Sequence, residues 1–205
     1  MEPDKMSDKY YEDMERVWAD SYPSVSSIED IESFYRESGY DGGFTPYIQK
    51  ILSHPSIRFE KARLLEFGCD NGIMLNYFKG RTLELYGVDI NSDDIRKGRE
   101  LFPEFNLVRS FGLEIPFKNK YFDVVFLSGV LKHIRHEDRA VIYQELARVA
   151  DFIIASELNS RTDTIEENGG FRFYNSNFIK ELTAYFDEIE IIRIGDNFHA
   201  IVMSR

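Results

Sequence analysis

Four residues near position 70 have the types and spacing of a ligand-binding turn. Glu66 lies in the apolar run Leu64–Phe67, and Gly68, Cys69 and Gly72 follow it. Glycine lets the backbone turn sharply and approach a ligand closely, and a helix that begins after such a turn directs backbone N–H groups at the ligand. The same spacing also occurs in tight strand-to-helix turns that bind nothing, so the turn alone does not decide between the two.

A further acid, Asp89, lies 21 positions after Gly68 at the end of the next apolar run. Parallel strands end at one edge of their sheet, and an acid there can bind both ribose hydroxyls of a nucleotide. The carboxylate could instead interact with the start of the following helix, as Asn91 or Ser92 could. The spacing favours the ribose role.

Three downstream segments complete a longer pattern. Ile115–Phe117, Phe122–Ser128 and Val130–Ile134 follow the glycine turn and Asp89 in that order. Over residues 64 to 134 the chain therefore resembles the class I S-adenosylmethionine-dependent methyltransferases of the small-molecule type. The resemblance implies S-adenosyl-L-methionine as cofactor and S-adenosyl-L-homocysteine as product.

The resemblance also implies roles for individual positions. Glu66 would hold the methionine ammonium, Asp89 the ribose, and Ser128 would offer its backbone carbonyl to the ammonium. The implied cofactor-binding positions of the turn and the strand ends are Glu66, Gly68, Cys69, Gly72, Asp89, Ile90 and Ser128.

Two positions depart from the family pattern. Asp70 replaces the middle glycine of the turn, and we expect it to cap the helix that starts at Gly72. Phe111 stands where the family often has an acid for the adenine amino group. We expect Phe111 to stack on the adenine while the Gly112 backbone N–H reaches a ring nitrogen.

His133 is the candidate catalytic residue. It follows the Phe122–Ser128 strand by a few positions, and its unperturbed pKa suits proton transfer near neutral pH. A general base contributes a factor of roughly 10² to 10⁴, although in-line methyl transfer does not always need one. A structural role is the alternative for His133, and Lys132 and His136 are the alternative bases.

Walls for the acceptor are expected from the aromatic first segment and from the loop after the fifth strand. The predicted substrate-binding residues are Tyr11, Trp18, Tyr22, Glu157 and Tyr174. An aromatic and acidic segment suits a neutral or cationic acceptor, and the alternative is that these tyrosines pack helices on the sheet. Tyr22 and Tyr40 lie in expected hinges of a mobile lid.

The alternation of short apolar runs and helical segments predicts the fold. We expect an α/β, Rossmann-like, doubly wound sheet of seven strands, mostly parallel, with a C-terminal antiparallel hairpin. The predicted strands are 64–67, 85–90, 105–108, 122–127, 152–155, 188–194 and 198–203, and the predicted helices between them are 72–78, 92–101, 137–149 and 178–186. Residues 159–174 are expected to form a long loop.

Helices also precede the sheet. A Ser27/Asp30 capping box and the Thr45-Pro46 pair mark two helix starts, and a third helix carries Tyr11 and Trp18 on one face. The helix after Ser27 should bury one face, formed by Ile28, Ile31, Phe34 and Tyr35. We expect residues 1–55 to form a helical cap packed on a methyltransferase domain of residues 56–205.

Composition limits the partners. The chain has 205 residues, 43% of them hydrophobic, a net charge of −11 and one cysteine, and it has no histidine or cysteine cluster with metal-ligand spacing. We therefore expect a cytoplasmic protein with a small-molecule acceptor, no metal, no nucleic acid and no membrane span. The sequence does not indicate the oligomeric state.

Two other functions share parts of this pattern. A nicotinamide-dependent oxidoreductase also has a strand, a glycine turn and a distal acid, but Gly68-x-x-x-Gly72 does not fit its G-x-G-x-x-G spacing. A non-catalytic binding or activating protein could keep the methyltransferase fold, with Phe111 as a sign of the change.

Overall fold

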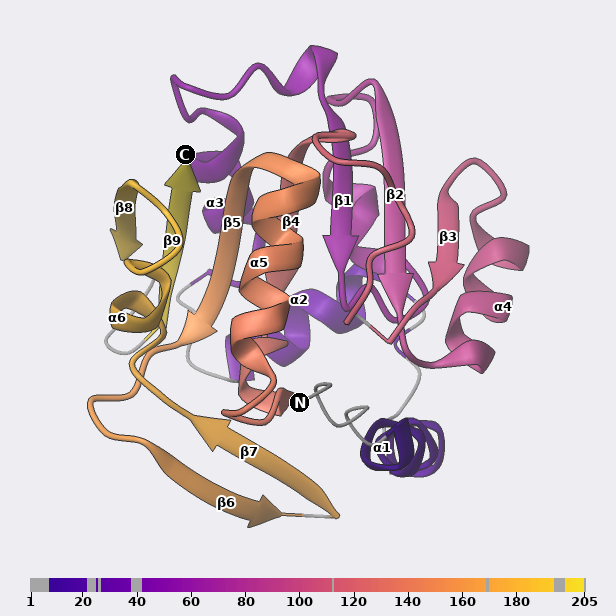
Figure 1. The fold of residues 1–205 in the computed structure, drawn as a ribbon. Helices are drawn as coiled ribbons and strands as arrows, with labels where there is room; N and C mark the ends of the chain where they lie inside the picture. Colours follow the sequence, from indigo (N-terminus) through magenta and orange to yellow (C-terminus); the bar gives the residue numbers. More distant parts are fainter. Residues whose placement is uncertain are drawn as a thin grey trace.

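The central sheet is formed by five parallel strands and an antiparallel hairpin. The computed structural model describes residues 8–21, 25, 27–37, 42–111, 113–168, 170–193 and 198–204. The strand order is β3-β2-β1-β4-β5-β9-β8 (Figure 1). The parallel strands are β1 (Arg63–Phe67), β2 (Glu84–Asp89), β3 (Asn106–Arg109), β4 (Phe122–Ser128) and β5 (Ala150–Leu158), and the hairpin is β8 (Glu188–Arg193) and β9 (Phe198–Ser204).

This arrangement confirms the predicted α/β fold with a mostly parallel sheet and a C-terminal antiparallel hairpin. Each predicted strand overlaps an observed one. The apolar runs were good guides because both faces of the parallel strands are covered, so successive side chains are buried whichever way they point. In β1, for example, Leu64 packs in one hydrophobic cluster and Leu65 in the other.

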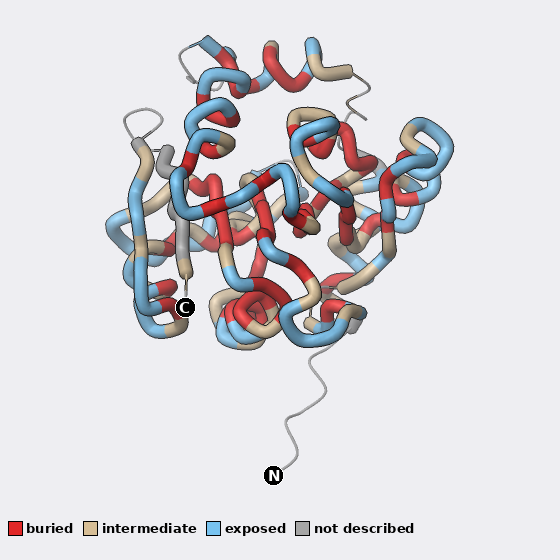
Figure 2. Tube along the Cα trace, turned by 90° about the horizontal axis from the view of Figure 1, so that it is seen from above, coloured by how far each residue is buried: buried red, intermediate tan, exposed pale blue. Residues whose placement is uncertain are grey.

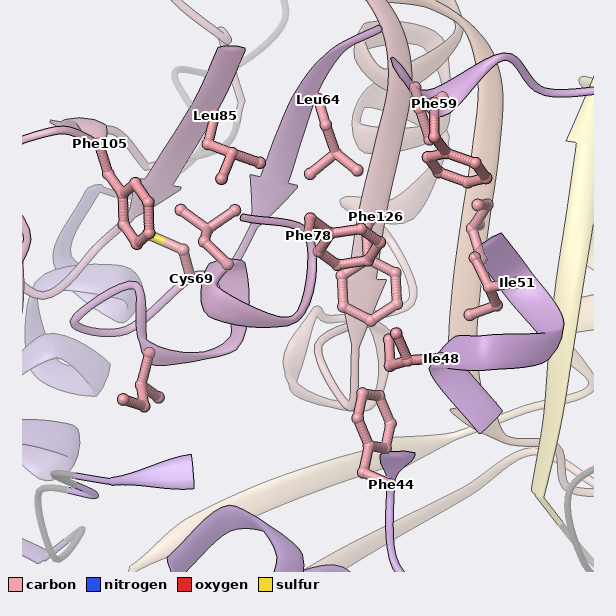
Figure 3. Packing of buried hydrophobic residues seen from close by; sticks show 14 of the residues in the cluster. Phe44, Ile48, Ile51, Phe59, Leu64, Cys69, Phe78, Leu85, Phe105 and Phe126 are labelled. Carbon is pink, nitrogen blue, oxygen red and sulfur yellow. The ribbon is translucent and has the colours of Figure 1, made fainter. Parts of the chain in front are cut away.

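Two hydrophobic clusters fill the two faces of the sheet. The first contains residues of α3 (Thr45–Leu52), α4 (Ser92–Leu101) and the 3₁₀ turn η2 (Ile73–Tyr77). Its middle is aromatic: the Phe78 and Phe126 rings lie 5.3 Å apart, with Ile48 and Phe59 beside them (Figure 3). The second cluster holds α5 (Arg139–Val149) and α6 (Phe178–Leu182) against the opposite face. Buried segments therefore run through the middle of the molecule (Figure 2).

The first two helices differ in how they contact the hydrophobic core. α2 (Ile28–Glu37) begins as predicted, because the Asp30 N–H donates to Ser27 Oγ at 3.2 Å. It contributes Ile31 and Tyr35 to the first cluster, where Tyr35 stacks on Phe44 at 4.3 Å. α1 (Asp8–Ser21) instead lies beyond the carboxyl ends of the strands (Figure 1).

A small second sheet corrects the prediction of a long loop over residues 159–174. β6 (Thr164–Asn168) and β7 (Phe171–Asn175) form an antiparallel hairpin. All five β6 residues are exposed, so this strand has no apolar run. The sequence Gly169-Gly170, a dipeptide typical of two-residue hairpin turns, was the available signal.

Two helix predictions also differ from the structure. The segment after Gly72 is the short 3₁₀ turn η2 instead of a full crossover helix, and Gly72 itself lies outside it with φ at +81°. The last helix, α6, is shorter than the predicted 178–186. Among the described helices, none has both the length and the apolar character needed to cross a membrane.

Candidate functional site

A cavity of about 490 Å³ lies at the carboxyl ends of β1, β2 and β4. Its other walls come from α1, from α2, from β7 and from η3 (Leu131–His133), the 3₁₀ turn after β4. This volume is within the range of small-molecule and cofactor sites. The predicted cofactor positions that line it are Glu66, Gly68, Cys69, Asp89, Ile90, Phe111 and Ser128.

Two other predicted cofactor positions are not among the lining residues. Gly72 faces β3, because a Cβ there would lie 3.2 Å from both methyl groups of Leu107. With its positive φ, it serves the turn and the packing behind it. Gly112 lies outside the described residues. Gly68 lines the cavity, and a Cβ on it would come within 2.5 Å of Val130, so this position needs glycine for packing as well.

Glu66 is a buried acid with an unsatisfied oxygen. It is the penultimate residue of β1 and is 2% exposed, and its Oε2 has no hydrogen-bond partner among the described residues. Burial raises the pKa of Glu66 well above its ordinary value, and the charges of Asp70 and Asp89 raise it further. A buried carboxylate in this state is stabilised by a cation placed against it.

Asp89 holds the turn that follows β1. One carboxylate oxygen accepts the backbone N–H of Asp70 and the other accepts that of Asn91, both at 2.8 Å. Burial raises the pKa of Asp89 to about 6, and these backbone hydrogen bonds oppose the shift. A carboxylate has about four acceptor positions, so these backbone contacts do not use all of them.

Asp70 does not cap a helix, contrary to the prediction. Asn71 takes that role, because the Ile73 N–H donates to Asn71 Oδ1 at 3.0 Å. Asp70 has φ at +53°, in the region that glycine normally occupies, and its carboxyl group hydrogen-bonds with Asp94 on the first turn of α4. Burial, and then the charge of Asp94, raise the pKa of Asp70. Asp94 also lines the cavity and was missed by the sequence analysis, since its position resembles an ordinary first-turn acid.

The side chain of Ser128 contacts a residue of α2. The hydroxyl groups of Tyr35 and Ser128 lie 2.8 Å apart, which joins α2 to the end of β4. Tyr35 lines the cavity too and was expected only as a core residue of its helix. Position alone in an amphipathic helix could not have indicated this contact.

α1 forms side-chain hydrogen bonds on both sides of the cavity. On one side, Glu15 accepts from Arg109 at 2.7 Å and from the Ser92 N–H at 3.0 Å. Arg109 also lies 4.5 Å from the centre of the Phe111 ring, so Phe111 is held on its own wall of the cavity. On the other side, the Tyr11 hydroxyl donates to the buried Asp138 at 2.6 Å.

His133 lies on the wall formed by η3, under α1. Its ring centre is 4.8 Å from that of Trp18 and 5.1 Å from that of Phe173. Burial, aided by the positive charge of Lys132, lowers the pKa of His133 to about 3 against a weaker opposing hydrogen bond with the Arg172 backbone. The imidazole is therefore uncharged at neutral pH, and its Nδ1 has no hydrogen-bond partner among the described residues.

The comparisons with known proteins agree with this geometry. Residues 65–151 match the family model of the methyltransferase domain. The matched segment contains the glycine turn, Asp89 and the strand Phe122–Ser128, the motifs that indicated the class I methyltransferases. The family predicted from the sequence motifs is thus confirmed. No curated protein sequence matches the chain.

Several solved structures have a similar fold at low sequence identity. The PH0226 protein of Pyrococcus horikoshii OT3 has a TM-score of 0.69 at 15% identity, over 92% of this chain and 98% of that one. An S-adenosylmethionine-dependent methyltransferase of Mesorhizobium loti has a TM-score of 0.60 at 11% identity, over 82% and 100%. Phosphoethanolamine N-methyltransferase 1 of Haemonchus contortus has a TM-score of 0.69 at 12% identity, and its match covers 95% of this chain but 48% of that one.

The predicted substrate-binding residues have three different outcomes in the structure. Tyr11 and Trp18 line the cavity from α1, and Tyr22 lies outside the described residues. Glu157 and Tyr174 are not among the lining residues. Tyr174 is buried, with its ring 5.6 Å from that of His136.

Glu157 has a structural task behind the cavity wall. It is fully buried at the end of β5, and its Oε1 accepts the N–H groups of Val130 and Leu131 at 2.7 and 2.9 Å. Burial raises the pKa of Glu157 to about 7. The residue thus holds the turn η3 that carries Lys132 and His133, instead of facing an acceptor.

Proposed function

We propose that the chain is an S-adenosylmethionine-dependent methyltransferase that acts on a small-molecule acceptor by in-line transfer. The observation that carries this proposal is Glu66, whose buried carboxylate has an oxygen without a partner among the described residues. The methionine ammonium of the cofactor would supply the missing cation. Glu66 shares its cavity with Gly68 and Asp89, so the two carboxylates provide hydrogen-bond acceptors for the ammonium and ribose hydroxyl groups of one ligand.

The remaining cofactor contacts follow from the same cavity wall. The Asp89 carboxylate would accept hydrogen bonds from the ribose hydroxyls. It would use the acceptor positions that its hydrogen bonds to backbone N–H groups leave open. Ile90 and Phe111 would enclose the adenine ring. This packing would replace the contact with the acid that is missing after β3. The Ser128 backbone carbonyl would join Glu66 at the ammonium, while the Ser128 hydroxyl is engaged with Tyr35.

S-adenosylmethionine supplies the chemistry, because its sulfonium carries an electrophilic methyl group. The protein has to align the acceptor and to exclude water, and alignment alone can lower a barrier by several kcal/mol, about 7 or more in favourable cases. We assign the exclusion of water to α1, which closes the cavity through its contacts on both sides. The lid is restricted to α1, because α2 contributes Ile31 and Tyr35 to the core.

His133 has a modest role in this proposal. A base with a pKa of about 3 takes up a proton poorly, so His133 would orient the nucleophile of the acceptor as a hydrogen-bond acceptor. Its unpartnered Nδ1 is the atom that can do so. A small acceptor is supported by the cavity volume of about 490 Å³, and the net charge of −11 disfavours nucleic acid.

The departure at Phe111 favours one second candidate, a non-catalytic binding protein with the same fold. Calorimetric titration with S-adenosylhomocysteine and, separately, with NAD tests the main proposal. We expect affinity in the micromolar range for the former and none for NAD. Silence toward both ligands would contradict the proposal. Binding of S-adenosylhomocysteine without methyl transfer to any of a panel of metabolites would favour the second candidate.

A further inference from the structure

The two ends of the cavity carry opposite charge. The end beneath β1 and β2 holds the acids Glu66, Asp70, Asp89 and Asp94. The end beneath η3 and β7 holds one cationic side chain, Lys132, among the lining residues that the structure describes. In the proposed function the acidic end receives the cofactor, so the end with Lys132 receives the acceptor.

The Lys132 side chain lies at the end of β4 on the cavity side of η3. Its Nζ is 5.4 Å from the centre of the Phe173 ring. Its Cε and Nζ are 3.8 and 3.9 Å from the position that a Cβ on Gly129 would take, so the chain extends along this glycine. Within the described part of the chain, no carboxylate oxygen lies within 4.0 Å of Nζ.

Neighbouring charges do not neutralise Lys132 fully. Glu157 interacts with it through space, but its Oε1 is already bound to the η3 backbone, and with a pKa of about 7 this acid is only partly ionised at neutral pH. His133 is uncharged there. The nearby cations Arg135 and Arg172 have their own carboxylate partners, Asp138 and Glu167. An ammonium in this position is therefore available to an anion.

The walls around Lys132 are aromatic. Trp18 from α1 and Phe171 from β7 have ring centres 4.7 Å apart, and Phe173 lies next to His133. These rings favour an apolar, flat body in the acceptor, since aromatic stacking adds to the free energy of burial. A ligand bound here would thus meet apolar surface on several sides and a positive charge on one.

We propose that the acceptor is a small aromatic monocarboxylate whose carboxylate binds the Lys132 ammonium while its ring packs among Trp18, Phe171 and Phe173. This inference rests on the proposed function. It differs from the neutral or cationic acceptor that the acidic first segment indicated, because the acids of the cavity lie at its other end. A dianionic phosphate fits less well, because one lysine is a single point charge without the paired donors of an arginine.

The test uses the full chain saturated with S-adenosylhomocysteine. Benzoate, phenylacetate and indole-3-acetate, each with its matched amide, are titrated by calorimetry into the wild type and three variants. Lys132→Met removes the charge at nearly constant volume, and Lys132→Arg keeps it. Lys118→Met is the matched control, because Lys118 also lies over an aromatic ring, at 5.7 Å from the centre of Tyr121, and does not line this cavity.

We expect at least one carboxylate to bind more tightly than its amide. Lys132→Met should weaken that carboxylate about tenfold or more and leave the amide within about threefold. Lys132→Arg and Lys118→Met should keep most of the affinity. The inference is overturned if the amides bind as tightly as the carboxylates, if Lys132→Met binds carboxylates as the wild type does, or if no carboxylate binds. S-adenosylhomocysteine binding is measured first in every variant, so its failure would identify a fault in the proposed function instead.

Discussion

The Asp89 carboxylate accepts the backbone N–H of Asp70 at 2.8 Å, which ties the end of β2 to the turn after β1. The other carboxylate oxygen binds the Asn91 N–H at the start of α4. Asp89 therefore organises two backbone segments of the cavity before any ligand is present. The ribose role proposed for Asp89 is added to this contact and does not replace it.

Substitution of Asp89 by asparagine should weaken both roles. The amide keeps one acceptor oxygen but directs an NH₂ group at one of the two backbone donors, and a hydrogen bond to a charged group is worth about 1.5–3 kcal/mol. We expect S-adenosylhomocysteine affinity to fall by about 10- to 100-fold in calorimetric titration. Asp93→Asn is the control, because Asp93 is on the same helix start but is exposed. Equal affinities for the two variants would remove Asp89 from the site.

Glu66→Gln should change stability and binding in opposite directions. Without ligand, the substitution removes a buried carboxylate that has an oxygen without a partner in the described structure, so the melting temperature should rise. In the presence of ligand, loss of the charge should weaken the binding of S-adenosylhomocysteine by at least about tenfold. Glu60→Gln, at an exposed position, should alter neither quantity. A variant that is less stable than the wild type and binds S-adenosylhomocysteine normally would contradict the proposed role of Glu66 in binding the ammonium.

The raised pKa values of the buried acids predict that the stability of the protein depends on pH. Glu66, Asp70 and Glu157 have folded-state pKa values above their ordinary ones, so the folded chain binds more protons than the unfolded chain near neutral pH. The free energy of unfolding should then fall as the pH rises from 6.5 to 8. Below about 6.5 the lowered pKa of His133 acts in the opposite direction, which restricts the prediction to this window.

Thermal melts at several pH values in that window provide the measurement. Glu66→Gln should reduce the slope, since it removes one of the titrating groups. Saturating S-adenosylhomocysteine should also reduce it, because a bound ammonium favours the ionised carboxylates. A melting temperature that rises from pH 6.5 to 8 in the free protein would show that these acids are not buried in solution.

The fold was largely predictable because buried parallel strands leave a simple signal. The runs 122–127 and 152–155 are apolar at almost every position, and both lie in the middle of the sheet. β6 left no such signal, since each of its residues is exposed and it pairs only with β7 among the described strands. Amphipathic periodicity also placed Phe34 on a buried helix face, whereas it is 49% exposed at the cavity.

The site was predictable where motifs coincide with strand ends. Glu66 and Asp89 lie near the carboxyl ends of two neighbouring parallel strands, so topology alone brings them together. Glu157 also ends a strand, but whether it faces the cavity depends on the turn after β4, whose N–H groups it binds. Lys132 illustrates the same limit: its type and position were visible, but the missing counter-charge depends on residues far away in sequence.

His133 should remain uncharged over the physiological range. Its pKa is lowered to about 3 by burial among aromatic rings and by the charge of Lys132. In NMR spectra the His133 ring signals should not titrate between pH 5 and 8. Trp18→Ala should open this environment and return the pKa toward its unperturbed value near 6.5. A titration of His133 near pH 6.5 in the wild type would restore it as a conventional general base.

The lid role of α1 predicts that its fastening affects cofactor release. Glu15 holds α1 to Arg109 and to the Ser92 N–H, and the pair is partly exposed, with side chains 18% and 42% accessible. Such a contact is worth at most about 1 kcal/mol, so Glu15→Gln should weaken S-adenosylhomocysteine by about two- to fivefold. Hydrogen exchange of the α1 amides should accelerate in parallel, because the helix has lost one of its two attachments. Glu12→Gln, an exposed position on the same helix, should change neither measurement. If Glu15→Gln accelerates exchange while cofactor affinity and turnover stay constant, α1 covers the cavity without controlling access to it, and the exclusion of water must come from β7 and η3.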